Sequence, residues 1–157
     1  GNSSGRNDGA AALLVMAAEK AERFGMKPRA RIVSAAASGC DPAIMGIGPV
    51  ESTRVALERA RLTLQDIDVI ELNEAFAAQS LAVIREWVKW GIDQESLMAK
   101  INPNGGAIAM GHPLGCTGAA LTVKCLSELR RVAPHRYGLI TMCCAGGLGV
   151  AMIVEKW

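Results

Sequence analysis

The chain alternates between short apolar runs and longer segments in which apolar residues recur every three or four positions. Four runs predict buried strands, since each is bounded by turn-forming or charged residues: ARIVSAAAS, DIDVIELN, YGLITMCC and GVAMIVE. Apolar positions at helical spacing predict three long helices. These positions are Ala56, Leu57 and Ala60; Phe76, Leu81, Val83, Ile84, Trp87 and Val88; and Leu114, Gly118, Leu121, Cys125 and Leu129.

The order of these elements predicts an α/β fold. Strands and helices alternate up to a final pair of strands, with a loop or short strand between the second and third helices, which gives the order βαβαβαββ. Such alternation is typical of parallel strands in one sheet with helices on both faces. The last two strands are joined by only a few residues and must be antiparallel. We therefore expect a mixed, mostly parallel five-stranded sheet.

The first 26 residues predict a further strand and helix. GNSSGRNDG begins as a glycine-rich loop and continues into AAALLVM, an apolar run that we expect to form a strand. AAEKAERF then predicts a short helix that ends at Gly25, because glycine commonly closes helices. The chain opens inside the glycine-rich motif with a residue other than Met, so we expect it to be part of a longer protein.

Composition and charge exclude several function classes. Hydrophobic residues make up 50% of the chain and charged residues 20%, as in globular proteins. The net charge of +2 is too small to favour a nucleic acid or a membrane surface as partner. The uncharged stretch from Gly138 to Val154 is about as long as the shortest membrane span, but its clustered glycines favour two strands and a turn. Five cysteines at irregular spacing predict reduced thiols in a cytoplasmic compartment.

Two loops carry residues that could take part in catalysis. Asn73 lies in LNEAF, where a strand passes into a helix, and it could either cap that helix or contribute to a site. His112 lies in GGAIAMGHPLGCTG and is followed by Pro113, which favours the start of a helix. The positive end of a helix dipole disfavours the imidazolium form, so a neutral, proton-accepting histidine fits this place. The alternative is a glycine-rich turn with a partly buried histidine.

The adjacent cysteines of TMCCAGGLG pose the same choice. A cysteine at the end of a strand beside a glycine-rich turn could act as a nucleophile or an acid/base, while N–H groups of the turn could stabilise an oxyanion. As an isolated feature, a buried core cysteine is the more common case. No metal site is expected, because no CxxC pair is present. A dinucleotide site is not expected either, since no GxGxxG follows the first strand.

In combination, the loops are similar to those of a known family. GNSSGRNDGAAA, IMGIGPV, NEAF, GGAIAMGHPLGCTGA and MCCAGGLG, in this order, resemble the motifs of the thiolase family. The resemblance runs from Gly1 to the end of the chain. It implies a subunit with two similar βαβαβαββ halves and a loop domain inserted in the first. Residues 1–26 would be the last strand and helix of the N-terminal half, and residues 27–157 the C-terminal domain.

The resemblance also implies an activity. Thiolases are acyltransferases of fatty acid metabolism that cleave 3-ketoacyl-CoA with coenzyme A or join two acyl-CoA units by Claisen condensation. Coenzyme A and acyl-CoA would be substrates, with no tightly bound cofactor. The family's nucleophilic cysteine lies in the N-terminal part, and none of the five cysteines matches it. We therefore expect the chain alone to be inactive, to need that N-terminal part, and to act in a homo-oligomer, a dimer or tetramer.

Three catalytic roles follow from position in these motifs. His112 matches the histidine that deprotonates the nucleophile and helps hold the thioester oxygen. Asn73 matches the residue that fixes a water in that oxyanion hole. Cys143 matches the cysteine that moves a proton at the α-carbon of the acyl-CoA, a task suited to a thiol whose pKa is close to neutral. Cys144, on the opposite side of the strand, is expected to be a packing thiol.

The binding roles follow in the same way. Ala145 stands where the family usually has glycine, and its N–H would serve a second oxyanion hole. Whether that turn tolerates a Cβ is open at this point. Ser4 matches a contact to pantetheine, and Met45 and Phe76 match residues that line the acyl and pantetheine tunnel.

Two alternatives remain. A ketoacyl-synthase-type condensing enzyme commonly has histidine or asparagine at the position of Cys143, so the pairing of Asn73 with Cys143 favours a thiolase. A non-catalytic thiolase-like domain could bind acyl-CoA or serve assembly. The presence of His112, Asn73 and Cys143 together argues against a non-catalytic domain.

Overall fold

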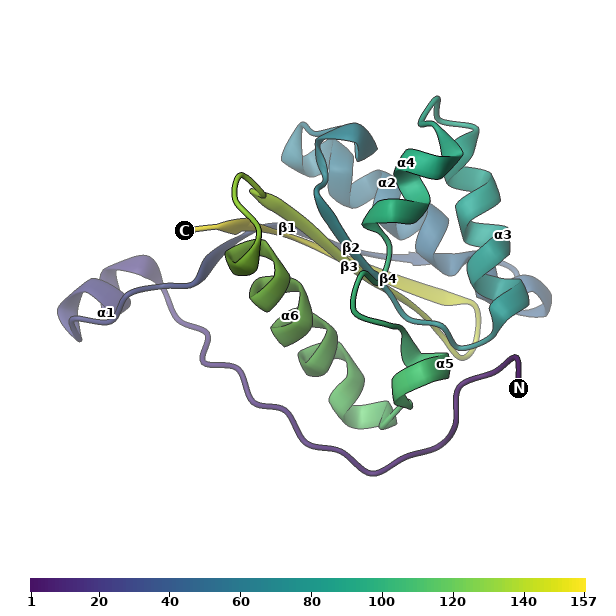
Figure 1. Ribbon diagram of the computed structural model, residues 1–157, viewed down its shortest axis with the longest axis horizontal. Helices are drawn as coiled ribbons and strands as arrows, with labels where there is room; N and C mark the ends of the chain where they lie inside the picture. The colour runs from purple at the N-terminus through teal and green to yellow at the C-terminus, as the bar shows by residue number, and fades with distance from the viewer.

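A four-stranded mixed sheet forms the centre of the computed structural model, which describes residues 1–157 (Figure 1). The strands are β1 (Ala30–Gly39), β2 (Val69–Leu72), β3 (Tyr137–Cys144) and β4 (Leu148–Lys156), and their order across the sheet is β1-β4-β3-β2. β2 and β3 are parallel, whereas β4 is antiparallel to both of its neighbours. Thus β1, β2 and β3 share one direction, and the expected antiparallel final pair is confirmed.

Two details of the expected sheet were wrong. Because β4 lies between β1 and β3, only one of the three strand pairs is parallel. The sheet also has four strands and not five. In place of the expected fifth strand there is one isolated parallel bridge between Ile70 and Ile101.

Asn102 explains why this fifth strand stops at once. Its backbone turns away with a φ of 47°. Its side-chain amide accepts a hydrogen bond from the Leu72 N–H at 2.9 Å and donates one to the Leu72 carbonyl at 2.9 Å. One side chain thus satisfies the edge groups that a neighbouring strand would otherwise pair.

Helices cover both faces of the sheet, as expected (Figure 1). α2 (Gly48–Ala60) and α3 (Ala77–Val88) lie on one face, and α6 (Leu114–Arg131) lies on the other. The larger core cluster joins strand residues to α2 and α3 and includes Leu139, Ile153, Ala56, Leu57, Val83 and Trp87. The smaller cluster lies under α6 and comprises Val69, Leu121, Cys125, Leu129, Ile140 and Val154. Neighbouring residues such as Leu139 and Ile140 therefore point to opposite faces.

Short helical segments connect these elements. They are α1 (Ala18–Arg23), α4 (Gln94–Lys100) and α5 (Ala107–Met110), with the 3₁₀ segments η1 (Pro42–Ile47) and η2 (Leu64–Asp66). α3 begins just after Phe76, the first apolar position of the predicted helix, which forms the N-cap. None of the helices combines the length and the hydropathy that a membrane crossing requires.

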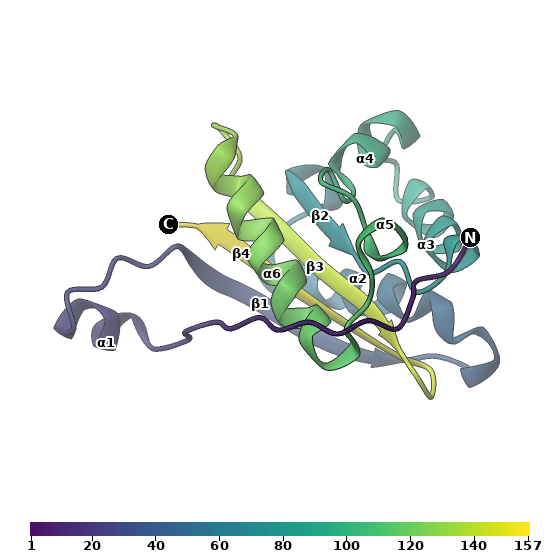
Figure 2. The same ribbon diagram turned by 60° about the horizontal axis from the view of Figure 1, so that its bottom comes forward.

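The apolar run AAALLVM does not form the expected strand. It is extended without a pairing partner, and Leu14 and Val15 are 71% and 68% exposed. Figure 2 shows this N-terminal segment passing across α6 on its way to α1, at a distance from the sheet. A strand needs a neighbour for its backbone hydrogen bonds, and no strand of the chain lies beside this segment. The short helix that follows it is confirmed, with Gly25 at a φ of 61°.

Candidate active site

A cavity of about 450 Å³ opens at the carboxyl ends of β2 and β3. This is the edge at which α/β sheets commonly form their sites. Segments from five parts of the chain line the cavity. Six of the seven residues singled out from the sequence are among them: Ser4, Met45, Phe76, His112, Cys143 and Ala145. The tertiary structure therefore brings together residues that lie up to 141 positions apart in the printed sequence.

Cys143 and Cys144 form the end of β3 and differ in exposure. Cys143 is 8% exposed, whereas Cys144 is half-buried. Both line the cavity, so Cys144 is accessible from the site, and its role as a packing thiol stays a prediction. Alternation along the strand does point the two side chains to opposite faces, but the strand ends there, and the cavity extends around its end.

Burial raises the pKa of the Cys143 thiol, and the neighbouring thiols Cys144 and Cys40 raise it further. This direction is opposite to the near-neutral pKa that would suit proton exchange at pH 7. Desolvation disfavours the thiolate, which keeps Cys143 protonated at neutral pH. In this state Cys143 is suited to give a proton to a carbanion.

Alkylation should distinguish the two cysteines. At pH 7, iodoacetamide is expected to modify Cys144 well before Cys143, because Cys143 is both buried and protonated. The rate at Cys143 should rise with pH up to its raised pKa, since only the thiolate reacts. Peptide mass spectrometry of timed samples measures both rates. Faster labelling of Cys143 than of Cys144 at pH 7 would contradict the conclusion that Cys143 is the buried, protonated thiol.

His112 lies two positions before α6 and is held at two points. Its backbone N–H donates to Asn7 Oδ1 at 3.0 Å. Its ring nitrogen Nδ1 lies 2.7 Å from Thr117 Oγ1, on the first turns of α6. Pro113 stands between His112 and the helix, so the expected position at a helix N-terminus is confirmed. The half-buried imidazole faces the cavity that Cys143 also lines.

Glu74 ties the LNEAF motif to the loop that carries His112. Its carboxylate accepts hydrogen bonds from the Ile108 N–H at 3.0 Å and from Asn102 Nδ2 at 3.2 Å. A Cβ at Gly106 would overlap this carboxylate, so the glycine permits the close approach. The sequence alone did not mark Glu74, Asn7 or Thr117. The available signal was their place inside the quoted motifs, beside residues that had been singled out.

Asn73 lies at the end of β2 and does not line the cavity. Its backbone N–H donates to the Thr141 carbonyl at 3.0 Å, which extends the pairing of β2 with β3. The helix-cap alternative is wrong, because Phe76 occupies the N-cap of α3. Asn73 is 1% exposed, and its buried Oδ1 has no hydrogen-bond partner. A buried amide without a partner is costly for folding alone, which favours a functional reason for this residue.

Ala145 occupies a place in the β3–β4 turn that accepts a side chain. The left-handed backbone conformation falls on Gly146 and Gly147, with φ values of 82° and 85°, and Ala145 has none. A Cβ at Gly147 would overlap the Cys40 carbonyl, and one at Gly149 would overlap the Gly48 carbonyl. Gly147 therefore lets the turn pack closely against Cys40, and Gly149 lets β4 pack closely against the start of α2. The substitution of alanine for the usual glycine causes no strain.

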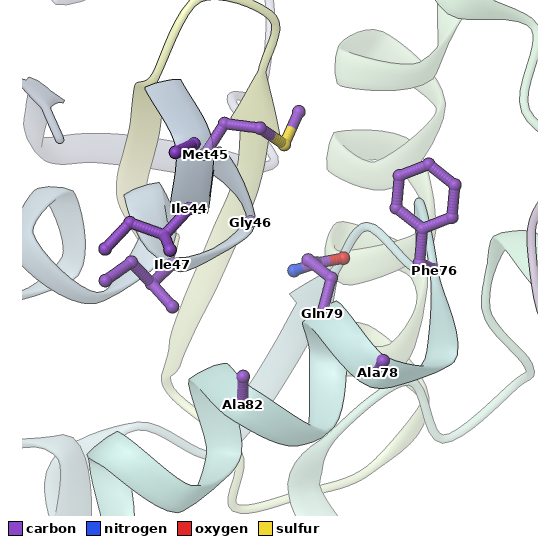
Figure 3. A pocket seen from close by; sticks show the side chains of 9 residues that line it. Ile44, Met45, Gly46, Ile47, Phe76, Ala78, Gln79 and Ala82 are labelled. Atoms are coloured by element: carbon purple, nitrogen blue, oxygen red, sulfur yellow. The ribbon is translucent and has the colours of Figure 1, made fainter. Parts of the chain in front are cut away.

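A second, more apolar cavity of about 370 Å³ adjoins the first. The two share Met45 and Phe76, and the second continues between η1 and α3 (Figure 3). Figure 3 shows the Gln79 side chain pointing into the gap between Met45 and Phe76. Gln79 Nε2 is buried without a hydrogen-bond partner.

Comparison with known proteins identifies the family. Residues 26–156 match the family model described as "Thiolase, C-terminal domain". Over 99% of its length, the chain is 55% identical to the beta-ketothiolase BktB of Cupriavidus necator, of which it covers 38%. It is also 53% identical to the 3-oxoadipyl-CoA/3-oxo-5,6-dehydrosuberyl-CoA thiolase of Escherichia coli. That match covers 99% of this chain and 37% of the Escherichia coli protein.

A solved structure agrees with these relatives. The crystal structure of the Bacillus anthracis acetyl-CoA acetyltransferase matches with a TM-score of 0.91 and 46% identity, over 99% of this chain and 38% of that one. The chain thus spans less than two fifths of the length of the relatives that it matches. It belongs to the thiolase family and is the C-terminal portion of a thiolase.

Proposed function

We propose that this chain supplies half of the active site of an acyl-CoA acyltransferase. The enzyme would cleave 3-ketoacyl-CoA with coenzyme A, or condense two acyl-CoA units in the reverse direction. The observation that carries the proposal is the single cavity lined by His112, Cys143, Ser4 and Phe76. A nucleophilic cysteine on the N-terminal part of the thiolase would complete this site, because each of the five cysteines here lies outside the motif of that nucleophile.

In the first half-reaction, His112 Nε2 takes the proton of the nucleophilic thiol. The sulfur of this nucleophilic cysteine attacks the 3-keto carbon. The bond between C2 and C3 then breaks, which leaves an acyl-enzyme thioester and the enolate of acetyl-CoA. Cys143 gives its thiol proton to C2 of this enolate and becomes a thiolate. Its raised pKa supports this direction, since the thiol begins the cycle protonated.

In the second half-reaction, the Cys143 thiolate takes the proton of coenzyme A, whose sulfur attacks the acyl-enzyme carbonyl. The nucleophilic cysteine leaves and recovers its proton from the His112 imidazolium. Both residues thus return to their starting state. Asn73 would fix a water that, with His112, forms one oxyanion hole. The Ala145 N–H would contribute to the second, and Ser4, Met45 and Phe76 would hold pantetheine and the acyl chain.

Residues 1–26 belong, in this proposal, to the N-terminal half of the enzyme, and residues 27–157 form the C-terminal domain. The exposed, unpaired run with Leu14 and Val15 supports this division, because a strand from the other half would cover it. The assembled enzyme would be a homo-oligomer, a dimer or tetramer. Five free cysteines support a reducing compartment such as the cytoplasm.

Reassembly tests the proposal. The 157-residue chain alone should show no thiolysis of acetoacetyl-CoA, because it has no acyl-accepting thiol. Mixing it with a separately expressed N-terminal thiolase part should restore turnover, measured as loss of the acetoacetyl-CoA enolate absorbance. Isothermal titration measures binding of that part and of coenzyme A. Turnover by the chain alone would refute the division of the site, and binding without turnover would favour a non-catalytic domain.

A further inference from the structure

We propose that Thr117 is a positioning residue that sets the tautomer of His112, leaving the lone pair on Nε2. The inference rests on the proposed function, in which Nε2 takes the proton of the nucleophile. It adds a residue of α6 that has no role among those already assigned.

The Thr117 hydroxyl lies between two polar neighbours. Oγ1 is 2.7 Å from His112 Nδ1 and 3.1 Å from the Pro113 carbonyl oxygen. A hydroxyl has one proton to donate and two lone pairs with which to accept. The carbonyl oxygen can only accept, whereas Nδ1 can either donate or accept. If the hydroxyl proton goes to Pro113, both contacts are hydrogen bonds only when Nδ1 carries a proton.

This arrangement leaves Nε2 as the free base. A neutral imidazole with its proton on Nδ1 has its lone pair on Nε2. When Nε2 then takes a proton, the Nδ1–H bond to Thr117 stays in place, and the new charge strengthens it. The ring therefore needs no reorientation during the proton transfer. Asn7 fixes the backbone of His112 on the other side, so ring and main chain are both held.

Burial protects the contact between Thr117 and His112 from water. Thr117 is 3% exposed, so bulk water competes little with its hydroxyl for the imidazole. The opposite arrangement, with the hydroxyl donating to Nδ1, would place the imidazole proton on Nε2. That tautomer could donate to an oxyanion but could not accept the proton of a thiol. The two arrangements make opposite predictions for the ring nitrogens.

Substitution in the reassembled enzyme tests the kinetic consequence. Thr117→Val keeps the side-chain shape and removes the acceptor, so kcat for thiolysis of acetoacetyl-CoA should fall about 10- to 100-fold, as for other residues that orient a histidine, with KM changed less than about threefold. Thr117→Ser retains the hydroxyl and should restore most of kcat. The matched control is Thr122→Val, which removes another buried α6 hydroxyl, one that bonds only the Gly118 carbonyl. Thermal unfolding of all three variants separates lost activity from lost folding.

Nitrogen-15 spectroscopy tests the tautomer without any activity. The chain has only two histidines, so labelling with ¹⁵N-histidine gives two rings to resolve, and His135→Asn assigns them. In the wild-type chain, His112 Nε2 should be the unprotonated nitrogen at a pH where the ring is neutral. In Thr117→Val, the share of ring with a proton on Nε2 should rise, while Thr122→Val leaves it unchanged.

Three results would overturn the inference: a proton on Nε2 in the wild-type chain, an unchanged tautomer in Thr117→Val, or a full kcat in that variant. Failure of the wild-type assembly to turn over would instead count against the proposed function. The spectroscopic result would still decide the role of Thr117 in that case.

Discussion

Cys143→Ser is expected to lower kcat/KM for thiolysis of acetoacetyl-CoA about 10²- to 10⁴-fold in the reassembled enzyme, the range that general acid–base groups usually contribute. The proposed role requires a group that gives a proton to a carbanion and then takes one from coenzyme A. A serine hydroxyl is far less acidic than a thiol, even than one whose pKa burial has raised, so it would slow the transfer of a proton to the carbanion. Steady-state kinetics at pH 7 measures the loss.

Cys144→Ser is the matched comparison on the same strand. Cys144 lines the cavity, so a modest loss is expected, within about tenfold, through altered packing. The alignment of TMCCAGGLG on the family's motif predicts that the proton carrier is the first cysteine. A larger loss for Cys144→Ser than for Cys143→Ser would overturn that alignment.

His112→Ala is expected to have an effect of similar size, about 10²- to 10⁴-fold on kcat, because the nucleophilic thiol would lose its proton acceptor. The substitution removes the ring that faces the cavity and leaves the backbone contact to Asn7 available. Formation of the acyl-enzyme should be the slowed step. Rapid mixing of the enzyme with acetoacetyl-CoA, followed by intact-protein mass spectrometry, measures the rate at which that intermediate accumulates.

His135→Ala supplies the control for this histidine. His135 follows α6 at the opposite end from His112 and lies outside both cavities. Its removal should leave kcat within about twofold of the wild-type value. Equal losses in both variants would show that the effect comes from stability and not from proton transfer.

The sequence predicted those residues of the site that belong to recognisable motifs. Six of the seven residues named from the motifs line one cavity, and the seventh, Asn73, lies beside it at the end of β2. The residues that hold them were not predicted. Glu74, Asn7 and Thr117 act through contacts to backbone groups or to another side chain, and such contacts have no periodicity that a sequence can display.

Two properties of the site depended on surroundings that the sequence does not show. A near-neutral pKa would suit the task assigned to Cys143, but the direction of its pKa shift is set by burial, which only the packing around β3 decides. Asn73 was open to a capping role, and the start of α3 at a later residue removed that role. In each case the residue type was clear and its environment was not.

The sequence by itself determined the elements and most of their order. Short apolar runs marked β3 and β4, helical spacing marked α2, α3 and α6, and the short connection forced an antiparallel pair. These are local properties, because side-chain periodicity depends on the backbone conformation of one segment. Tertiary structure alone decided that β4 lies between β1 and β3, and that Asn102 takes the place of a fifth strand. It also left the run with Leu14 and Val15 unpaired, because a strand forms only where another backbone lies beside it to share its hydrogen bonds.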